Sequence, residues 1–203
     1  LDKPVVTQKG VLLTAAPSLA WAGDAGVMTW AQLSLRSGQM ELMQQRIERA
    51  GTGQNPVRLH STDNLLLGVR TAFDGSVFST SVEELPSTGS NPVVSLARSN
   101  YQRVELAPKP VTDGGLFAGE SAIVAHQGVS GIAWVQGTDA MLQVRLGRVN
   151  SQGVLQGEST KLSGVSPFGV MPDLTWNLRD RGARDYAAVW SEHVLPDAKR
   201  LLT

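Results

Sequence analysis

The chain has 203 residues, contains no cysteine, and balances 18 lysines and arginines against 18 aspartates and glutamates. This length suits one all-β domain, so we expect a single domain over residues 1–203. The lack of cysteine excludes disulfides, thiolate metal ligands and a cysteine nucleophile. The zero net charge gives no general attraction to nucleic acid, and no apolar run reaches the about 18 residues of a membrane-spanning helix. We therefore expect neither nucleic-acid binding nor membrane insertion.

The first predicted strands lie in residues 17–47. Residues 17–21 read Pro-Ser-Leu-Ala-Trp, and a turn separates them from an alternating apolar segment at 27–32. A third segment follows at 39–47, where Met, Gln, Glu and Arg also favour a helix. Its place after two strands leads us to predict a strand there.

The same arrangement recurs along the chain. Residues 172–176 read Pro-Asp-Leu-Thr-Trp and precede an alternating segment at 186–192, and the segment 121–125 leads through glycines to 132–136. Weaker copies start at Pro56 and Pro92. The predicted units therefore start near 17, 56, 92, 121 and 172, about 39 residues apart on average, which is a spacing typical of repeat proteins.

Units of this length fit four-stranded antiparallel blades that stack around a central channel. The predicted fold is an all-β β-propeller of five blades, or a fragment of a larger propeller. Residues 5–13 have no inner strands before them, and 198–202 have no outer strand after them. We expect the first segment to complete the last blade and close the ring. In a fragment, the same two segments would mark a cut through a larger ring.

The repeated pattern resembles a known kind of protein. The motif P-x-Φ-x-W, a turn, V-W-S-E and an alternating strand is similar to repeats of secreted or surface-associated bacterial β-propeller proteins. The residues that carry it are Pro172, Leu174, Trp176, Tyr186, Val189, Trp190, Ser191 and Glu192, with Arg148, Val149, Gly153, Val154 and Leu155. The resemblance implies a propeller fold and an extracytoplasmic location in the periplasm, on the surface or outside the cell. It carries no catalytic motif.

All five tryptophans fall within the repeated strands, at Trp21, Trp30, Trp134, Trp176 and Trp190. One interpretation is a set of platforms on which sugar rings stack. The other is packing between blades, since a tryptophan buries up to about 250 Å². Regular placement on apolar strands favours packing.

The three histidines come from three different units. His60 occupies the place that tryptophan holds in the first and last units, so it is expected to pack there. His60, His126 and His193 could instead meet at the channel as a metal site, which needs neutral imidazoles at about 2.0–2.1 Å from the ion. Nothing in the linear spacing demonstrates such convergence, and we predict no metal and no cofactor.

Ligand-binding residues are expected where the repeat departs from its own pattern. His60 replaces a tryptophan, and Glu105 stands where an apolar residue is expected. Arg179, Arg181 and Arg184 form the densest charge cluster, either as a docking loop or as a solvated hairpin with ion pairs worth about 0–1 kcal/mol each. These five residues are the predicted ligand contacts.

Catalytic signals are weak in the sequence. Glu83 and Glu84 form a like-charged pair that could raise one pKa, but neighbours on a strand point to opposite faces. Ser18, Ser121 and Ser191 lie in repeat positions rather than in a nucleophile elbow.

Three functions remain open from the sequence. The leading one is a non-catalytic module whose loops bind a protein or a glycan. The alternatives are a glycan-active hydrolase with carboxylates in the central channel, and a structural subunit that assembles with other chains or domains. Carboxylates about 5–9.5 Å apart at one channel mouth would favour the hydrolase, whereas an apolar mouth would argue against it.

Overall fold

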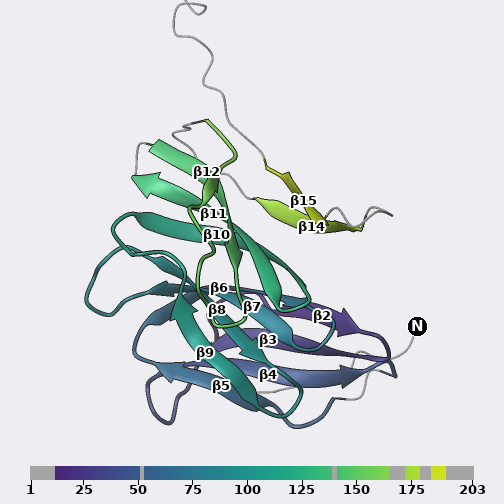
Figure 1. The fold of residues 1–203 in the computed structure, drawn as a ribbon. Helices are drawn as coiled ribbons and strands as arrows, with labels where there is room; N and C mark the ends of the chain where they lie inside the picture. The colour runs from purple at the N-terminus through teal and green to yellow at the C-terminus, as the bar shows by residue number, and fades with distance from the viewer. Residues whose placement is uncertain (1–11, 51–52, 139–140, 165–171, 179–183, 191–203) are drawn as a thin grey trace, which may run out of the picture.

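The protein is all-β. The computed structural model describes residues 12–50, 53–138, 141–164, 172–178 and 184–190, and within these ranges it has fifteen strands and no helix (Figure 1). None of the described segments is a helix able to cross a membrane. The strand predicted at 39–47 is confirmed as Met40–Glu48, so its place in the unit outweighs the helix preference of its residues.

The strands form three larger sheets and one pair. The first sheet contains β1 (Leu12–Leu13), β2 (Ser18–Ala22), β3 (Ala25–Leu33), β4 (Met40–Glu48) and β5 (Val57–Thr62). The second contains β6 (Leu65–Phe73), β7 (Phe78–Leu85), β8 (Val93–Ser99) and β9 (Val104–Pro110). The third contains β10 (Phe117–His126), β11 (Val129–Thr138), β12 (Met141–Val149) and β13 (Thr160–Lys161). The fourth pairs β14 (Asp173–Leu178) with β15 (Arg184–Val189).

Each sheet is antiparallel and is built from strands that lie close together in the chain. The β10–β11 turn consists of Gln127 and Gly128, both with positive φ, as a two-residue type I′ hairpin requires. In the first hairpin, Trp21 of β2 lies across Gly26 of β3. A Cβ on Gly26 would fall 1.9 Å from Cε3 of Trp21, so only glycine fits there.

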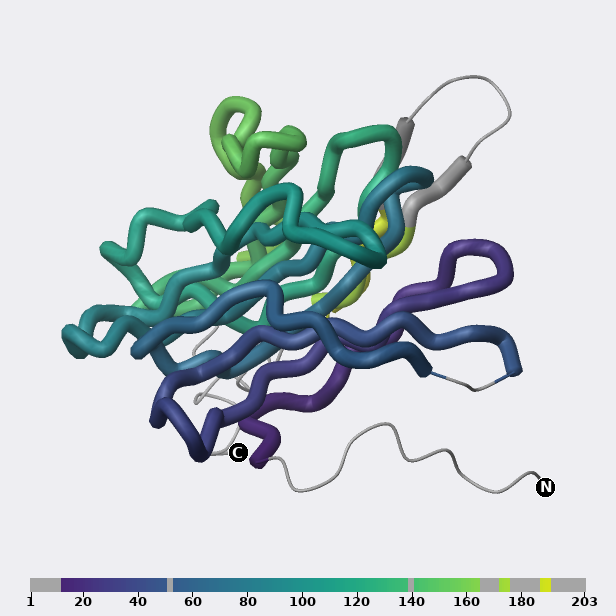
Figure 2. Tube along the Cα trace, turned by 90° about the horizontal axis from the view of Figure 1, so that it is seen from below, coloured from purple at the N-terminus to yellow at the C-terminus, as the bar shows by residue number. Residues whose placement is uncertain are grey.

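The four sheets follow one another in chain order as a stack of blades (Figure 2). Four strands, β2, β6, β10 and β14, pack against one another in that order. We call them the first, or inner, strands of their sheets. Apolar cores fill the seams between the sheets. Leu42 and Val69 belong to the core between the first and second sheets, and Leu96 and Ile132 to the core between the second and third. This is the arrangement of a β-propeller or of part of one.

The position of the repeat differs from the prediction in its second and third units. The first strands begin at Ser18, Leu65, Phe117 and Asp173, roughly fifty residues apart. The predicted start at Pro56 instead precedes β5, the last strand of the first sheet, and Pro92 precedes β8, the third strand of the second sheet. Inner and outer strands show the same alternation of apolar residues, so the sequence does not distinguish an outer strand that follows a proline from an inner one.

The predicted ring closure concerns segments at the two ends of the chain. Of the N-terminal segment, the structure describes Leu12–Leu13, which pair with β3, so these two residues belong to the first sheet and not, as predicted, to the last blade. Residues 5–11 and 198–202 lie outside the described residues, so closure between them stays a prediction.

Two of the tryptophans confirm the packing interpretation. Trp30 of β3 is 2 % exposed and Trp134 of β11 is 1 % exposed, and each indole N–H donates to the glutamine two residues later. This repeated Trp-x-Gln pair marks the second strand of the first and third sheets. Trp21 differs, since it is 46 % exposed, and the side chain of Trp176 lies outside the described residues.

Candidate functional site: a central pocket and a carboxylate pair

A pocket of about 400 Å³ lies where the first strands of the four sheets meet. This volume is within the range of small-molecule sites. All four inner strands contribute to its lining, which consists of Ser18, Arg70, Thr71, Ala122, Ile123, Pro172 and Asp173. The pocket therefore occupies the position of the channel in a propeller.

The walls of the pocket are fixed by short hydrogen bonds. Ser18 Oγ of β2 accepts from the Thr71 N–H of β6 at 2.9 Å, and the Thr71 and Thr80 hydroxyls lie 3.1 Å apart. On the opposite wall, Leu174 packs into a core with Ala122, which anchors β14. Because side chains alternate along a strand, this anchoring leaves Asp173 exposed at the pocket.

Arg70 supplies the positive charge of the pocket. Its neighbour Val69 is buried in the core toward the first sheet, and Ala72 packs into the core toward the third, so Arg70 faces the third sheet. Its Nη1 donates to the Val69 carbonyl at 3.0 Å. Among the residues that the structure describes, no carboxylate forms an ion pair with Arg70.

Beside the pocket, the seam between the second and third sheets holds a buried polar cluster around Glu83. Glu83 of β7 lies opposite Gly68 of β6, where a Cβ would fall 2.7 Å from the Glu83 Cδ. Because Gly68 has no side chain, the Glu83 carboxylate can extend across β6 to Ser121 of β10. Its Oε1 accepts from the Ser121 N–H of β10 at 2.7 Å and lies 3.0 Å from Ser121 Oγ, which is also 3.0 Å from Ser81 Oγ.

Glu120 stands at an irregularity of β10. The pairing of β10 with β11 shifts register between Gly119 and Ala122, and Glu120 has a φ of 48°. Positive φ is unusual for a non-glycine residue, and bulges of this kind redirect side chains. Desolvation, and then the negative charge of Glu83, raise the pKa of Glu120 above its ordinary value. Glu83 and Glu120 thus form a like-charged pair. Glu120 lies on β10 two residues before Ala122, which lines the pocket.

The sequence predicted that Glu83 and Glu84 form a like-charged pair, and Glu84 is the wrong partner. Its neighbour Glu84 faces elsewhere and accepts from the Asn64 side chain at 3.2 Å, as alternation along a strand predicts. The like-charged partner is Glu120, which the sequence analysis did not single out. The available signal was an acid flanked by Gly119 and Ser121 within an otherwise apolar inner strand.

The predicted ligand residues are dispersed over the fold. His60 lies on β5, the last strand of the first sheet, and Glu105 lies on β9, the last strand of the second. Glu105 accepts from Arg103 Nε at 2.8 Å and from the Asn100 side chain at 2.7 Å in a surface turn. Neither residue lines the central pocket.

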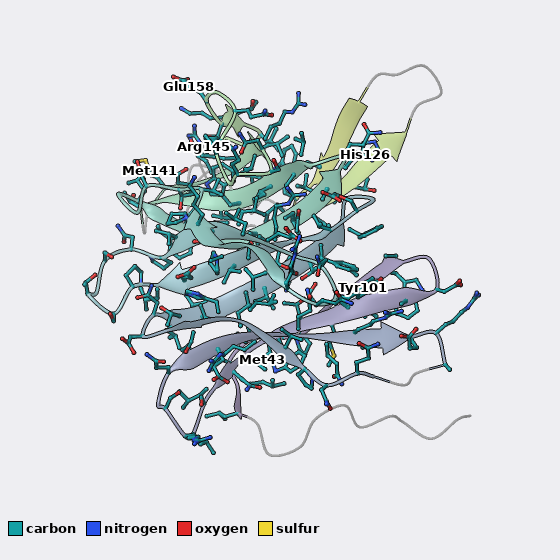
Figure 3. All side chains as sticks on the ribbon, turned by 60° about the horizontal axis from the view of Figure 1, so that its bottom comes forward. Met43, Tyr101, His126, Met141, Arg145 and Glu158 are labelled. Atoms are coloured by element: carbon teal, nitrogen blue, oxygen red, sulfur yellow. The ribbon has the colours of Figure 1, made fainter. Side chains whose placement is uncertain are left out.

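The arginine cluster and the histidine hypothesis fall partly outside the described residues. Arg179, Arg181 and His193 are among the undescribed residues, and Arg184 begins β15 with its side chain undescribed. His126 ends β10, in a different sheet from His60 (Figure 3). Within the described ranges, no three histidine or acidic side chains are grouped to hold a metal ion.

Comparison with known proteins shows the fold. No protein-family model matches the sequence, and no curated protein matches it. Among solved structures, the GH43_1 enzyme from Xanthomonas citri complexed with xylotriose aligns with a TM-score of 0.52 and 13 % identity, covering 79 % of this chain and 57 % of that one. An endo-arabinase from Bacteroides thetaiotaomicron aligns with a TM-score of 0.57 and 8 % identity, covering 94 % and 78 %. The chain thus spans little more than half the length of the Xanthomonas enzyme.

These structures correct the functional prediction. We expected a non-catalytic binding module, but the two solved structures described above, which share the fold, are a GH43_1 enzyme and an endo-arabinase. The finding favours the alternative named from the sequence, a glycan-active propeller hydrolase. The sequence could not make this choice because it contains no catalytic motif, and because Glu83 and Glu120 come together only across a seam between sheets.

Proposed function

We propose that this chain carries the site of a glycan-active hydrolase, located at the central pocket and the adjoining seam between β6 and β10. The observation that carries the proposal is the like-charged pair of Glu83 and Glu120. Glu120 stands at a bulge of β10, two residues before Ala122, which lines the pocket together with Asp173. Glycoside hydrolysis needs one carboxyl that holds a proton and a second that is ionised.

The roles follow from the environment of each group. The raised pKa of Glu120 keeps a larger fraction of this side chain protonated, which suits a general acid. It gives its proton to the glycosidic oxygen as the bond from that oxygen to the anomeric carbon breaks. In one route, Asp173 takes a proton from the water whose oxygen attacks the anomeric carbon. In the other, Asp173 attacks this carbon itself, and a water that gives its proton to Glu120 then breaks the resulting ester bond and frees Asp173. Glu83, held by Ser121, acts on Glu120 through its charge.

The comparisons support a glycan as the substrate class. The Xanthomonas enzyme that shares the fold was solved with xylotriose and with xylose, and another protein with the fold is an endo-arabinase. These facts concern those proteins. For this chain we propose an oligosaccharide or polysaccharide substrate. An extracytoplasmic location stays a prediction and would suit an enzyme that acts on polymers.

The test is the release of reducing ends from a panel of plant and bacterial polysaccharides. We expect Glu120→Gln and Asp173→Asn each to lower kcat by about 10²- to 10⁴-fold, because each removes a proton-transfer group. Glu158→Gln is the control, since Glu158 is exposed at the outer side of the third sheet (Figure 3). The proposal fails if no polysaccharide is cleaved, or if both site variants cleave as fast as the unmodified protein.

A further inference from the structure

We propose that Arg70 binds the carboxylate of an acidic sugar, so that the pocket takes glycans that contain uronic acid. This inference rests on the proposed function, since it assigns a substrate class to the same pocket. It is drawn from the placement of one guanidinium in a pocket whose other lining residues, apart from Asp173, are small, hydroxylic or apolar.

Arg70 differs from most described arginines in lacking a carboxylate partner. Five others each pair with an acidic side chain, namely Arg46, Arg49, Arg58, Arg98 and Arg103. Among the described residues, Arg70 donates through Nη1 to the Val69 carbonyl. A guanidinium has five N–H donors, so within this part of the chain the other donors have no hydrogen-bond partner and can bind a ligand in the pocket.

The surroundings of Arg70 leave room for that ligand. Ala122 of β10 is small, and the Ser18 hydroxyl is held back by the Thr71 N–H. The planar guanidinium matches a carboxylate through two parallel hydrogen bonds, which a lysine cannot provide. A uronic acid carries such a carboxylate on an otherwise neutral ring.

The second charge of the pocket orients the same ligand. Arg70 lies on β6 and Asp173 on β14, and these strands pack on the two sides of β10. A sugar between them meets a cation on one wall and an exposed carboxylate on the other. The acid group of a uronate would bind Arg70, and its hydroxyl groups would donate to Asp173. A neutral sugar uses only half of this arrangement.

The experiment compares binding and cleavage of matched oligosaccharides by the full chain. Calorimetry with trigalacturonate and with xylotriose is run on the unmodified protein and on Arg70→Gln, Arg70→Lys and Arg58→Gln. Arg58 is a matched control, because it lies on β5 and pairs with Glu41 away from the pocket. Unfolding is measured for each variant.

We expect the unmodified protein to prefer trigalacturonate. Arg70→Gln should weaken its binding about 10- to 100-fold, because a charge-assisted pair is lost, and should leave xylotriose binding unchanged. Arg70→Lys should recover part of the affinity, and Arg58→Gln should have no effect. A sulfated trisaccharide serves as a second anion, and equal binding of it would contradict recognition of a carboxylate.

The outcomes separate this inference from the proposed function. Equal binding of neutral and acidic trisaccharides, or an unchanged Arg70→Gln variant, overturns the role of Arg70 while leaving the hydrolase proposal standing. Binding of trigalacturonate that depends on Arg70, without cleavage of any glycan, supports the binding site and overturns the hydrolase. Failure to bind any glycan overturns both.

Discussion

The two ends of the second sheet hold acidic side chains in opposite conditions. At the β6–β7 turn, Asp74 is 2 % exposed, and its Oδ1 accepts from Ser76 N, Ser76 Oγ and Val77 N at 2.8 Å each. Its Oδ2 pairs with Arg98 of β8, which is 8 % exposed. Burial acts to raise the pKa of Asp74, but these donors and the guanidinium outweigh burial and hold the pKa below its ordinary value.

At the other end, Glu83 and Glu120 lie in the seam between the second and third sheets, and neither forms an ion pair with a described cation. The charge of Glu83 is met by the backbone and hydroxyl of Ser121, and Glu120 stands exposed on a bulge with a raised pKa. A carboxylate such as Asp74, whose oxygens all accept hydrogen bonds, holds the turn in place and stays ionised to a lower pH than a free carboxylate. A carboxyl group beside another carboxylate keeps its proton to a higher pH than it would alone. On the proposed function, the Asp74 end serves stability and the Glu120 end serves the reaction.

The largest effect is expected at Asp74. Asp74→Ala leaves Arg98 as an unpaired buried charge and should lower the free energy of unfolding by about 3–5 kcal/mol. Glu120→Ala should change it by no more than about 0.5 kcal/mol, because Glu120 is exposed. Urea denaturation of the two variants measures the contrast. Similar losses at both positions would contradict the division into a structural and a functional end.

Gly68→Ala comes next and acts on Glu83. The new Cβ would lie 2.7 Å from the Glu83 Cδ and 2.8 Å from its Oε2, so the carboxylate must leave its place beside Ser121. We expect a loss of about 1–3 kcal/mol from overpacking. Adding Glu83→Ala should restore most of the stability, and a double-mutant cycle measures this coupling. Additive effects of the two changes would show that Glu83 does not occupy the space above Gly68.

Ser121→Ala and Ser76→Ala compare single hydroxyl groups at the two ends. Each variant should lose about 0.5–1.5 kcal/mol of unfolding free energy, since each removes one hydrogen bond to a carboxylate that keeps a backbone donor. Their effects on Glu120 should differ. NMR titration should find the pKa of Glu120 changed in Ser121→Ala and unchanged in Ser76→Ala. If the pKa of Glu120 were the same in both variants, it would not depend on the contact between Glu83 and Ser121.

The smallest effect concerns the pH dependence of stability. Because the pKa of Glu120 is raised in the folded protein, its contribution to stability is present below its unfolded pKa of about 4.3 and is lost as pH rises through the folded pKa. Asp74 acts in the opposite sense, with stability present above about pH 3.9 and lost as pH falls through its lowered folded pKa. Glu120→Gln should therefore reduce the fall in the free energy of unfolding that occurs as the pH rises just above about 4.3. Urea unfolding at steps of pH measures it, and an unchanged profile would contradict the raised pKa.

The sequence by itself determined the local structure. Alternation of apolar residues and the placement of glycine and proline predicted short antiparallel strands over most of the chain, including the strand at 39–47 that the structure has at Met40–Glu48, and the burial of Trp30 and Trp134. These features depend on residues close together in the chain, so a reading of neighbouring positions recovers them.

Only the tertiary structure decided which strands are central and which acids meet. Pro56 and Pro92 begin strands as convincingly as Pro17 does, because the alternation is the same in inner and outer strands, and only packing around the pocket distinguishes them. Glu83 and Glu120 belong to different sheets, and Arg70 and Asp173 to strands on two sides of a third. Such pairs form when sheets stack, since contact across a seam depends on the register and stacking of whole sheets and leaves no mark in the local pattern.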